Sequence, residues 1–394
     1  MSGRAVALVG GATTRFGVRP VTWSELAQEV GAALFRAVPE LRAEAVDSLF
    51  LGAAMPERFA FQSHVAPLAA EQMGLRPTRI LQRTELACAS GQSAIRSAFA
   101  AIASGLSEVA VAVGVEKMNL PSMAEANSAM ASVMDRPWDG VHGATAPPYF
   151  AMVAQRHMLE HGTTEEQLAA VSEKNHRFAN ANPDAQFHEK TFSRDRLLRL
   201  PLVAPPLRLG DCSAMTDGAA AVVLASEEAS RGFSGAKAWV RGTSQYSDFH
   251  NLANAGPLTD WVGLRHAARE ALGMAGITVD QLDFAELHDC FTISEIVEYE
   301  ALGLCPKGKG GAFALDGQGD LGGRLPVNTR GGLLGCGHPL GATGVAQAVE
   351  VHRQFAGILP EKRQVRDPAW ALVHNLSGSA NVHSVMVYQN GRAA

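Results

Sequence analysis

The sequence predicts an α/β protein made of two similar halves, with a long insertion in the first half. Short apolar strands bounded by glycine alternate with stretches of helical periodicity, which is typical of sheets covered by helices on both faces. The second half repeats the order of elements in the first half. Between residues 119 and 208 the composition changes, and proline, asparagine, histidine, methionine and arginine become frequent. An ordinary doubly wound sheet with coincidental symmetry is the alternative.

The first half begins with a buried strand that ends in a pair of glycines. A helix is expected from Trp23 to Val38, with Ser24 as its N-cap. The strands of this half are expected at residues 5–9, 46–51, 109–113 and 219–225. The insertion carries helical patches, such as residues 164–179, between irregular stretches that are expected to form binding loops.

The second half contains matching elements in the same order. A helix at residues 261–275 corresponds to the first helix of the chain. The matching strands are expected at residues 238–242, 282–287, 370–373 and 382–388. The predicted domains are therefore residues 1–118 plus 209–236, an inserted loop domain at 119–208, and a second half at 237–394.

Composition excludes several classes of protein. The chain has 394 residues, of which 47% are hydrophobic and 19% charged, so disorder is excluded and a sizeable core is expected. A formal net charge of −5 does not fit a general nucleic-acid binder. No apolar run is long enough to span a bilayer, and the N-terminal apolar run is too short for a signal peptide.

The five cysteines, an odd number with no pair two residues apart, indicate neither a disulfide framework nor a zinc site. We expect a cytoplasmic protein without a metal or membrane partner.

The first candidate for chemistry is Cys88. It lies among small residues and precedes a helix-forming stretch that ends near Ser104. The dipole and the unpaired N–H groups of a helix N-terminus favour the thiolate, which is the nucleophilic form of cysteine. The pattern therefore predicts a nucleophile that an extended substrate can approach. A buried structural cysteine is the alternative.

The second candidate is His338, in a glycine-rich turn at residues 331–344. The glycine spacing of this turn does not match the dinucleotide fingerprint G-x-G-x-x-G. His338 precedes Pro339 at the expected start of a helix, where its ring is placed to face a pocket. An imidazole there can take a proton from a thiol or polarise a carbonyl. A capping or core histidine is the alternative.

Two further turns follow expected strands. His288 and Cys290 come directly after the strand at 282–287, and ligands of α/β sheets gather at the C-terminal ends of strands. Next to Asp289, these two side chains form a candidate acid/base pair. The turn at 374–380 can present backbone N–H groups to an oxyanion. Together, the four turns predict a single site.

In combination and in this order, these segments resemble thiolases over nearly the full length of the chain. The matching segments are residues 87–91, 114–118, 217–221 and 337–344. The resemblance implies the thiolase fold, with two βαβαβαββ halves in a five-layered αβαβα arrangement. It also implies an inserted loop domain that binds coenzyme A, and a homodimer or homotetramer.

Two turns that differ from those of other thiolases indicate the subfamily. His288-Asp289-Cys290-Phe291 stands where other thiolases carry Asn-Glu-Ala-Phe, and the turn at 375–378 lacks their late cysteine. Both features resemble the sterol-carrier-protein type of thiolase and its bacterial and archaeal relatives. In that group the cysteine of the His-Asp-Cys-Phe turn is proposed to replace the missing acid/base, and that cysteine is Cys290 here. Ser377 and Ser379 depart from the family, in which glycines are usual at those positions.

The resemblance also implies roles for individual residues. Cys88 would form the acyl-enzyme, His338 would accept the thiol proton, and Cys290 would shuttle the proton of the second thioester. His288 and a water would hold the enolate oxygen, and the N–H groups of Cys88 and Ser377 would form the second oxyanion hole.

Contacts with coenzyme A are expected at His142 and Ser244, although a solvated loop histidine is the alternative for His142. Coenzyme A and acyl-CoA are expected as substrates in lipid metabolism, with no cofactor bound permanently. Some relatives work beside a small protein with an OB fold and a zinc ribbon.

Three other functions compete with a thiolase. One is a decarboxylating condensing enzyme of the ketoacyl-synthase type. Such enzymes use two histidines, or a histidine and an asparagine, and His288, His338 and Asn375 would take those places here. Another is retro-aldol cleavage of a branched acyl-CoA. The last is a non-catalytic subunit of a complex, which the missing late cysteine favours and the intact Cys88, Cys290 and His338 oppose.

Overall fold

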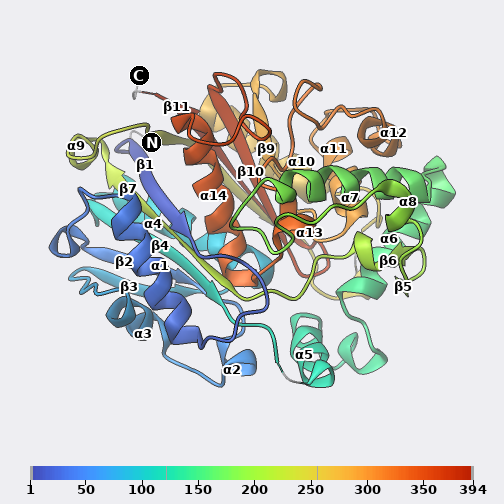
Figure 1. Ribbon diagram of the computed structural model, residues 1–394, viewed down its shortest axis with the longest axis horizontal. Coiled ribbons are helices and arrows are strands. Elements are labelled where there is room, and N and C mark those ends of the chain that lie inside the picture. The colour runs from blue at the N-terminus through green and yellow to red at the C-terminus, as the bar shows by residue number, and fades with distance from the viewer. Residues whose placement is uncertain (1–2, 121, 255, 392–394) are drawn as a thin grey trace.

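The computed structural model describes residues 3–120, 122–254 and 256–391, and strands alternate with helices along the chain (Figure 1). Residues 1–2 and 392–394, which are the two ends of the expected domains, therefore lie outside the described residues. The strands are β1 (Val6–Thr13), β2 (Ser48–Gly52), β3 (Ile80–Thr84), β4 (Val109–Glu116), β5 (Leu202–Ala204), β6 (Leu207–Arg208), β7 (Gly218–Ser226), β8 (Ala238–Ser247), β9 (Phe284–Glu286), β10 (Trp370–Ser377) and β11 (Val382–Asn390). The helices are α1 (Trp23–Ala37), α2 (Pro56–Phe59), α3 (Val65–Gln72), α4 (Ser90–Ala103), α5 (Met123–Met130), α6 (Ala146–His161), α7 (Glu165–Asn180), α8 (Arg194–Leu197), α9 (Glu227–Ser230), α10 (Val262–Ala275), α11 (Thr292–Ala301), α12 (Gly310–Leu315), α13 (Gly332–Cys336) and α14 (Leu340–Ala356).

The sheet confirms that the chain is built from two similar halves. Its nine strands run in the order β3-β2-β4-β7-β1-β8-β11-β10-β9. From the centre outwards, β1, β7, β4 and β2 of the first half correspond to β8, β11, β10 and β9 of the second half. The outer pairs, β2 with β4 and β9 with β10, are parallel, whereas the inner pairs are antiparallel. Among the described residues, two residue pairs between β1 and β8 join the two half-sheets.

Helices fill the layers between and outside the half-sheets. Helices α4 and α14 pack against each other and contact strands of both halves, so they form the middle layer. Figure 1 shows α14 near the centre of the molecule, between β1 and β10. Helices α1 and α3 cover the outer face of the first half-sheet, and α10 and α11 contribute to the core beside the second. The expected αβαβα layering is therefore present.

The residues between β4 and β7 lie largely over the second half. Helix α7 packs against α11, α12 and α13, and α6 contributes Tyr149 and Phe150 to the core of the second half. Segments from both halves and from the insertion are thus close to the ends of β9 and β10. None of the described helices has both the length and the apolar character that crossing a bilayer requires.

The start of the first helix differs from the prediction. Thr22, not Ser24, is the N-cap of α1, because the Thr22 Oγ1 accepts the N–H of Glu25 at 3.2 Å. The Glu25 carboxylate accepts the N–H of Thr22 in return, at 2.6 Å. This is a capping box, whose Thr-x-x-Glu spacing is visible in the sequence.

Candidate active site

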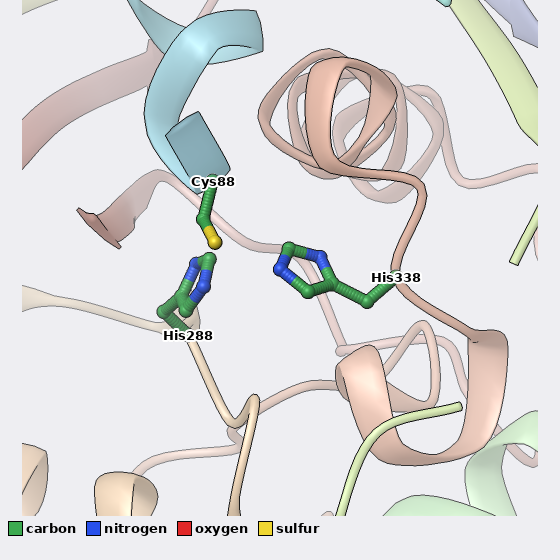
Figure 2. A group of neighbouring side chains, drawn as sticks. All are labelled: Cys88, His288 and His338. Carbon is green, nitrogen blue, oxygen red and sulfur yellow. The ribbon is translucent and has the colours of Figure 1, made fainter. Parts of the chain in front are cut away.

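Three of the predicted side chains meet in the middle of the molecule. Cys88 lies in the short 3₁₀ turn Ala87–Ala89 before α4, His338 lies just before α14, and His288 follows β9. The Cys88 Sγ and a nitrogen of each imidazole all lie within 4.8 Å of one another (Figure 2). The rings of His288 and His338 meet edge to face, with centroids 5.0 Å apart. The fold therefore brings the nucleophile candidate to two imidazoles.

Glycines allow the turns before α4 and α14 to approach this closely. A Cβ on Gly91 would lie 2.5 Å from the carbonyl oxygen of Gly341, and a Cβ on Gly114 would lie 2.1 Å from the same oxygen. Any side chain at either position would push the turn of His338 away from that of Cys88. The small residues around Cys88 therefore allow close packing of the helices as well as access of a substrate to the thiol.

A buried carboxyl group fixes the same junction. Glu116, at the end of β4, accepts N–H groups from Ala54 at 2.7 Å, Met55 at 3.2 Å and Gly341 at 3.0 Å. The carboxyl therefore links the segment after β2 to the turn that carries His338. Burial raises the pKa of Glu116 to about 7, although the three N–H groups act to lower it.

Hydrogen bonds determine which nitrogen of His338 carries the proton. The Thr343 Oγ1 donates to the carbonyl oxygen of Pro339 at 3.0 Å, so its only proton is used there. His338 Nδ1 lies 2.7 Å from the Thr343 Oγ1 and must therefore be the donor to it. The Nε2 of His338 is buried without a partner among the described residues, and it keeps a free lone pair. Burial lowers the pKa of His338 to about 3, so the ring is neutral and the lone pair of Nε2 is unprotonated.

The thiol of Cys88 is protonated in the free protein, contrary to the prediction from its helix position. Burial raises its pKa to about 12, whereas the backbone N–H groups of Cys88 and Gly378 lower it. The carboxylates of Glu116 and Glu85 raise it further. The two N–H groups are too weak to overcome the loss of solvation, so ionisation of the thiol requires an adjacent base. The preceding residue, Ala87, has a φ of +42°, a strained conformation that holds the turn in place.

Cys290 and Ser377 lie near the same junction. The Sγ of Cys290 is buried 3.6 Å from the Ser294 Oγ. Its pKa is raised well above the usual value, first by burial. Ser377 ends β10 and, with Ala87 and Gly378, lines a cavity of about 430 Å³. The half-buried Cys88 directly follows Ala87, one of the residues that line this cavity.

The two residues expected to contact coenzyme A lie in different surroundings. Ser244, in β8, is buried and its hydroxyl donates to the Glu270 Oε2 at 2.5 Å. His142 ends the 3₁₀ turn Gly140–His142 and is exposed. Neither residue belongs to the Cys88 group, and their expected contacts with coenzyme A stay predictions.

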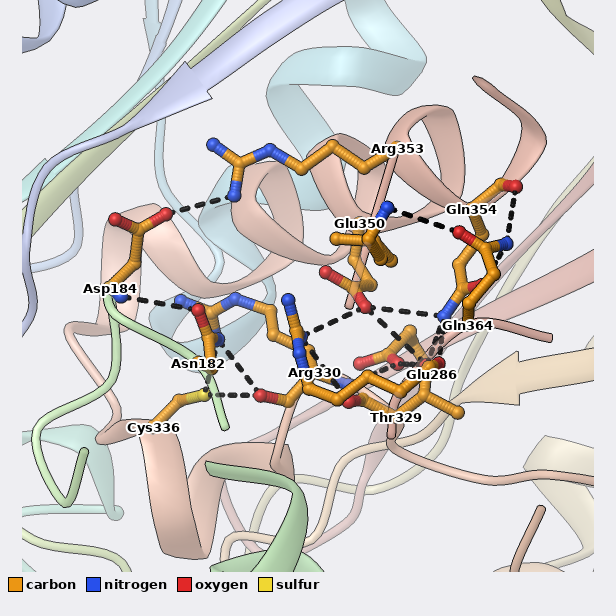
Figure 3. A network of polar contacts seen from close by, with 12 residues as sticks. Asn182, Asp184, Glu286, Thr329, Arg330, Cys336, Glu350, Arg353, Gln354 and Gln364 are labelled. Atoms are coloured by element: carbon orange, nitrogen blue, oxygen red, sulfur yellow. Dashed lines mark hydrogen bonds and ion pairs between the residues drawn. The ribbon is translucent and has the colours of Figure 1, made fainter. Parts of the chain in front are cut away.

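A polar network includes Cys336, which lies two residues before His338 in the sequence (Figure 3). The Cys336 Sγ donates to the carbonyl oxygen of Arg330 at 3.0 Å and accepts from Asn182 at 3.5 Å. Further along, Arg363 pairs with Glu350 at 3.1 Å. Cys336 is thus engaged in the packing of α13, as expected for a structural cysteine.

Several contributing residues were not singled out in the sequence. Thr343 lies inside the recognised turn, and its hydroxyl five residues after His338 was the available signal. Gly378 supplies an N–H to the sulfur next to the expected donor Ser377. Glu298 accepts the N–H of His288 at 3.2 Å and contacts His374 Nδ1 at 2.9 Å. Glu298 is ten residues from His288, and only the fold of α11 places it there.

Comparisons with known proteins agree with this geometry. Residues 6–228 match the family model described as "Thiolase, N-terminal domain", and residues 244–390 match "Thiolase C-terminal domain-like". The acetyl-CoA acetyltransferase of Methanothermobacter thermautotrophicus is 39% identical over 98% of this chain and 99% of its own length. Human sterol carrier protein 2 is 34% identical over 77% of this chain and 57% of its own length. A solved structure described as "Ltp2-ChsH2(DUF35) aldolase" superposes with a TM-score of 0.83 at 24% identity, covering 98% of both chains.

Proposed function

The chain belongs to the thiolase family of acyltransferases, and we propose that it makes or cleaves 3-ketoacyl-CoA through an acyl group carried on Cys88. The observation that carries the proposal is the pairing of a protonated thiol with a neutral imidazole. His338 presents an unprotonated Nε2 to the junction at which the Cys88 Sγ lies. A base in that state can take the thiol proton as the sulfur attacks.

The first half-reaction transfers the acyl group. The Cys88 Sγ bonds to the thioester carbon as its proton passes to His338 Nε2. The bond from that carbon to the sulfur of coenzyme A then breaks, and the proton leaves with the released thiol. The N–H of Cys88, with that of Ser377 or Gly378, would hold the oxygen of the tetrahedral intermediate. Loss of one such donor typically costs about 10²–10³ in rate.

The second half-reaction forms or breaks the carbon–carbon bond. The Cys290 thiol would first pass its proton to the neutral His338 Nε2, and the resulting thiolate would remove the α-proton of a second acyl-CoA. The enolate oxygen would face His288. Neither ring nitrogen of His288 has a partner among the described residues, so both are free to donate to or accept from a substrate. The α-carbon then attacks the acyl carbon on Cys88, the bond from that carbon to the Cys88 Sγ breaks, and the freed thiolate takes the proton held on His338. Two covalent half-reactions predict ping-pong kinetics.

Substrate binding and assembly complete the proposal. The cavity of about 430 Å³ beside Cys88 is the proposed entrance for the acyl chain or pantetheine, with His142 and Ser244 as proposed contacts with coenzyme A. We also propose a homodimer or homotetramer in the cytoplasm, active in lipid metabolism. A partner with an OB fold and a zinc ribbon fits the DUF35 component named with the aldolase structure.

Retro-aldol cleavage of an acyl-CoA is a second candidate, favoured by the similarity of the fold to that aldolase structure. It needs an acid/base pair such as His288 and Cys290, but no acyl-enzyme. The intact pairing of Cys88 with His338 favours the thiolase reaction instead.

Mass spectrometry of the intact protein distinguishes these reactions. After incubation with acetyl-CoA, we expect one acetyl group on Cys88 and none on a Cys88→Ser variant. Cys290→Ala should still be acetylated yet should form no acetoacetyl-CoA, because only the second half-reaction uses Cys290. Absence of an adduct in the wild-type protein, with cleavage of a branched 3-hydroxyacyl-CoA, would instead establish the aldolase. Absence of both activities would favour a non-catalytic subunit.

A further inference from the structure

We propose that Cys88, His288 and His338 also form a binding site for a divalent metal ion of the zinc type, which occupies the junction in competition with acyl-CoA. The three ligand atoms lie within 4.8 Å of one another, which is close to the spacing that one ion imposes (Figure 2). Zinc binds sulfur at about 2.3 Å and imidazole nitrogen at about 2.0–2.1 Å, so its ligand atoms lie roughly 3.3–3.6 Å apart. At 4.8 Å, the ligand atoms must move closer together by about 1.2–1.5 Å for one ion to bind all three.

The free nitrogens of the two histidines give the second line of evidence. The Nε2 of His338 and both ring nitrogens of His288 are buried and have no partner among the described residues. A buried ring nitrogen without a partner loses its hydrogen bond to water, so a ligand that takes its lone pair is favoured. Since the two histidines are fully or nearly fully buried and Cys88 is half-buried, an ion that binds here loses most of its contact with bulk water.

The surroundings already orient one of the ligands. A metal-bound histidine usually donates its other N–H to a neighbouring group, which fixes the ring. His338 makes this contact through Nδ1 and the Thr343 Oγ1 at 2.7 Å. The backbone of His288 is held in turn, because its N–H donates to Glu298 at 3.2 Å.

The donor set selects the kind of ion. One sulfur and two imidazoles suit Zn²⁺ or Co²⁺, whereas Mg²⁺ and Ca²⁺ require oxygen ligands. Binding forms a metal–sulfur bond at Cys88 and releases the thiol proton to water, with no change in oxidation state. Three protein ligands leave a fourth position, which a water or the substrate can take. An ion in this place blocks acyl transfer, since it occupies the Cys88 lone pairs.

Cobalt provides a test that does not depend on enzyme activity. The full-length protein, reduced with a phosphine and stripped of metal, is titrated with Co²⁺ and followed by absorption. We expect a thiolate-to-cobalt charge-transfer band together with the visible bands of a four-coordinate ion, both lost when Zn²⁺ is added and both unaffected by Mg²⁺. Acetyl-CoA should compete with Co²⁺ for this site, either by binding there or by acylating Cys88.

Variants connect the signal to the three residues. Cys88→Ser should abolish the charge-transfer band, and His288→Asn should weaken Co²⁺ binding at least about tenfold. Thr343→Val should weaken it by about 10–100-fold, as expected when the group that orients a metal-bound histidine is removed. Cys212→Ser is the matched control, because the Cys212 Sγ donates to the Arg208 carbonyl oxygen outside this group. Each variant is compared at unchanged far-ultraviolet circular dichroism.

Two results would overturn the metal site. One is the absence of a thiolate band in the wild-type protein. The other is a band that survives in Cys88→Ser, which would place the ion elsewhere. Neither result depends on acyl transfer: if the proposed thiolase reaction is wrong but the site is right, the cobalt band still appears and no acetyl adduct forms.

Discussion

At the scale of single residues, the site combines a protonated thiol at Cys88 with a neutral imidazole at His338, and does not depend on a reactive thiolate. The Cys88 pKa is raised to about 12 and the His338 pKa is lowered to about 3, in both cases first by burial. Burial keeps both groups neutral, so the proton moves only when a substrate offers the sulfur a carbon to attack. This arrangement protects the thiol from nonspecific alkylation, and acyl transfer then depends on the tautomer of His338.

Thr343 should therefore control the rate of acylation. In Thr343→Val the Nδ1–H of His338 loses its acceptor, so both tautomers and other ring orientations become populated. We expect acylation of Cys88 by acetyl-CoA to slow by about 10–100-fold, in the range of a lost general-base contribution. Thr343→Ser keeps the hydroxyl and should retain most of the rate. Rapid-quench mass spectrometry measures the step directly, and equal rates in the two variants would contradict this role.

Glu116 should make the stability depend on pH. Its pKa is about 7 in the folded chain, above the ordinary value of 4.5, so the folded state holds a proton that the unfolded state releases. The free energy of unfolding should therefore decrease as the pH rises from 4.5 to 7, by about 3 kcal/mol from this one group. Denaturant titrations at several pH values measure the slope. Glu116→Gln should lower stability at acidic pH, because an amide cannot accept three N–H groups, but its slope should be flatter. An unchanged slope would contradict the assignment.

At the scale of elements, the site is made where glycine turns bring α4 and α14 together. Gly114→Ala tests this contact, since its Cβ would meet the Gly341 oxygen at 2.1 Å. We expect a loss of about 1–3 kcal/mol in stability, and a larger fractional loss of acylation because the turn of His338 must shift. Gly273→Ala, in α10, is the control. Its Cβ would meet nothing within 4 Å, and alanine favours a helix. Wild-type acylation in Gly114→Ala would show that the contact is unimportant.

The sequence predicted the elements better than the contacts between them. Apolar strands and the repeated order of elements predicted both halves, because each element is determined by local periodicity. The turns of Cys88, His288 and His338 were found because small residues and histidines there have no local structural purpose. The neutral thiol was missed, since its pKa depends on burial by segments far away in the chain. The role of Glu116, inside the matching segment 114–118, and that of Glu298 were missed for the same reason. An acidic residue in a strand or helix shows no partner until the fold surrounds it.

At the scale of the whole molecule, one edge of the sheet is left without a neighbour. In the part of the chain that the structure describes, strand β3 pairs only with β2, and its Leu81 is 40% exposed. At the other end of the sheet, β9 gains a further parallel bridge between Ala285 and Val327. Strand β3 contains neither proline nor lysine, and its Arg83 is turned back to the carbonyl oxygens of Ala53 and Ala54. Proteins usually protect an exposed edge strand with proline or lysine, or cover that edge with another chain.

We therefore predict that a second copy of the chain pairs with β3, which would make the homodimer that the thiolase resemblance implies. Two copies related by a twofold axis would bring the same strand face to face, so a charge placed there is repelled by its own copy. Leu81→Asp should shift the protein towards the monomer in light scattering coupled to size exclusion. Leu159→Asp, at a 78% exposed position on α6, should leave the mass unchanged. A monomeric wild-type protein, or a dimer unaffected by Leu81→Asp, would show that β3 is not the interface.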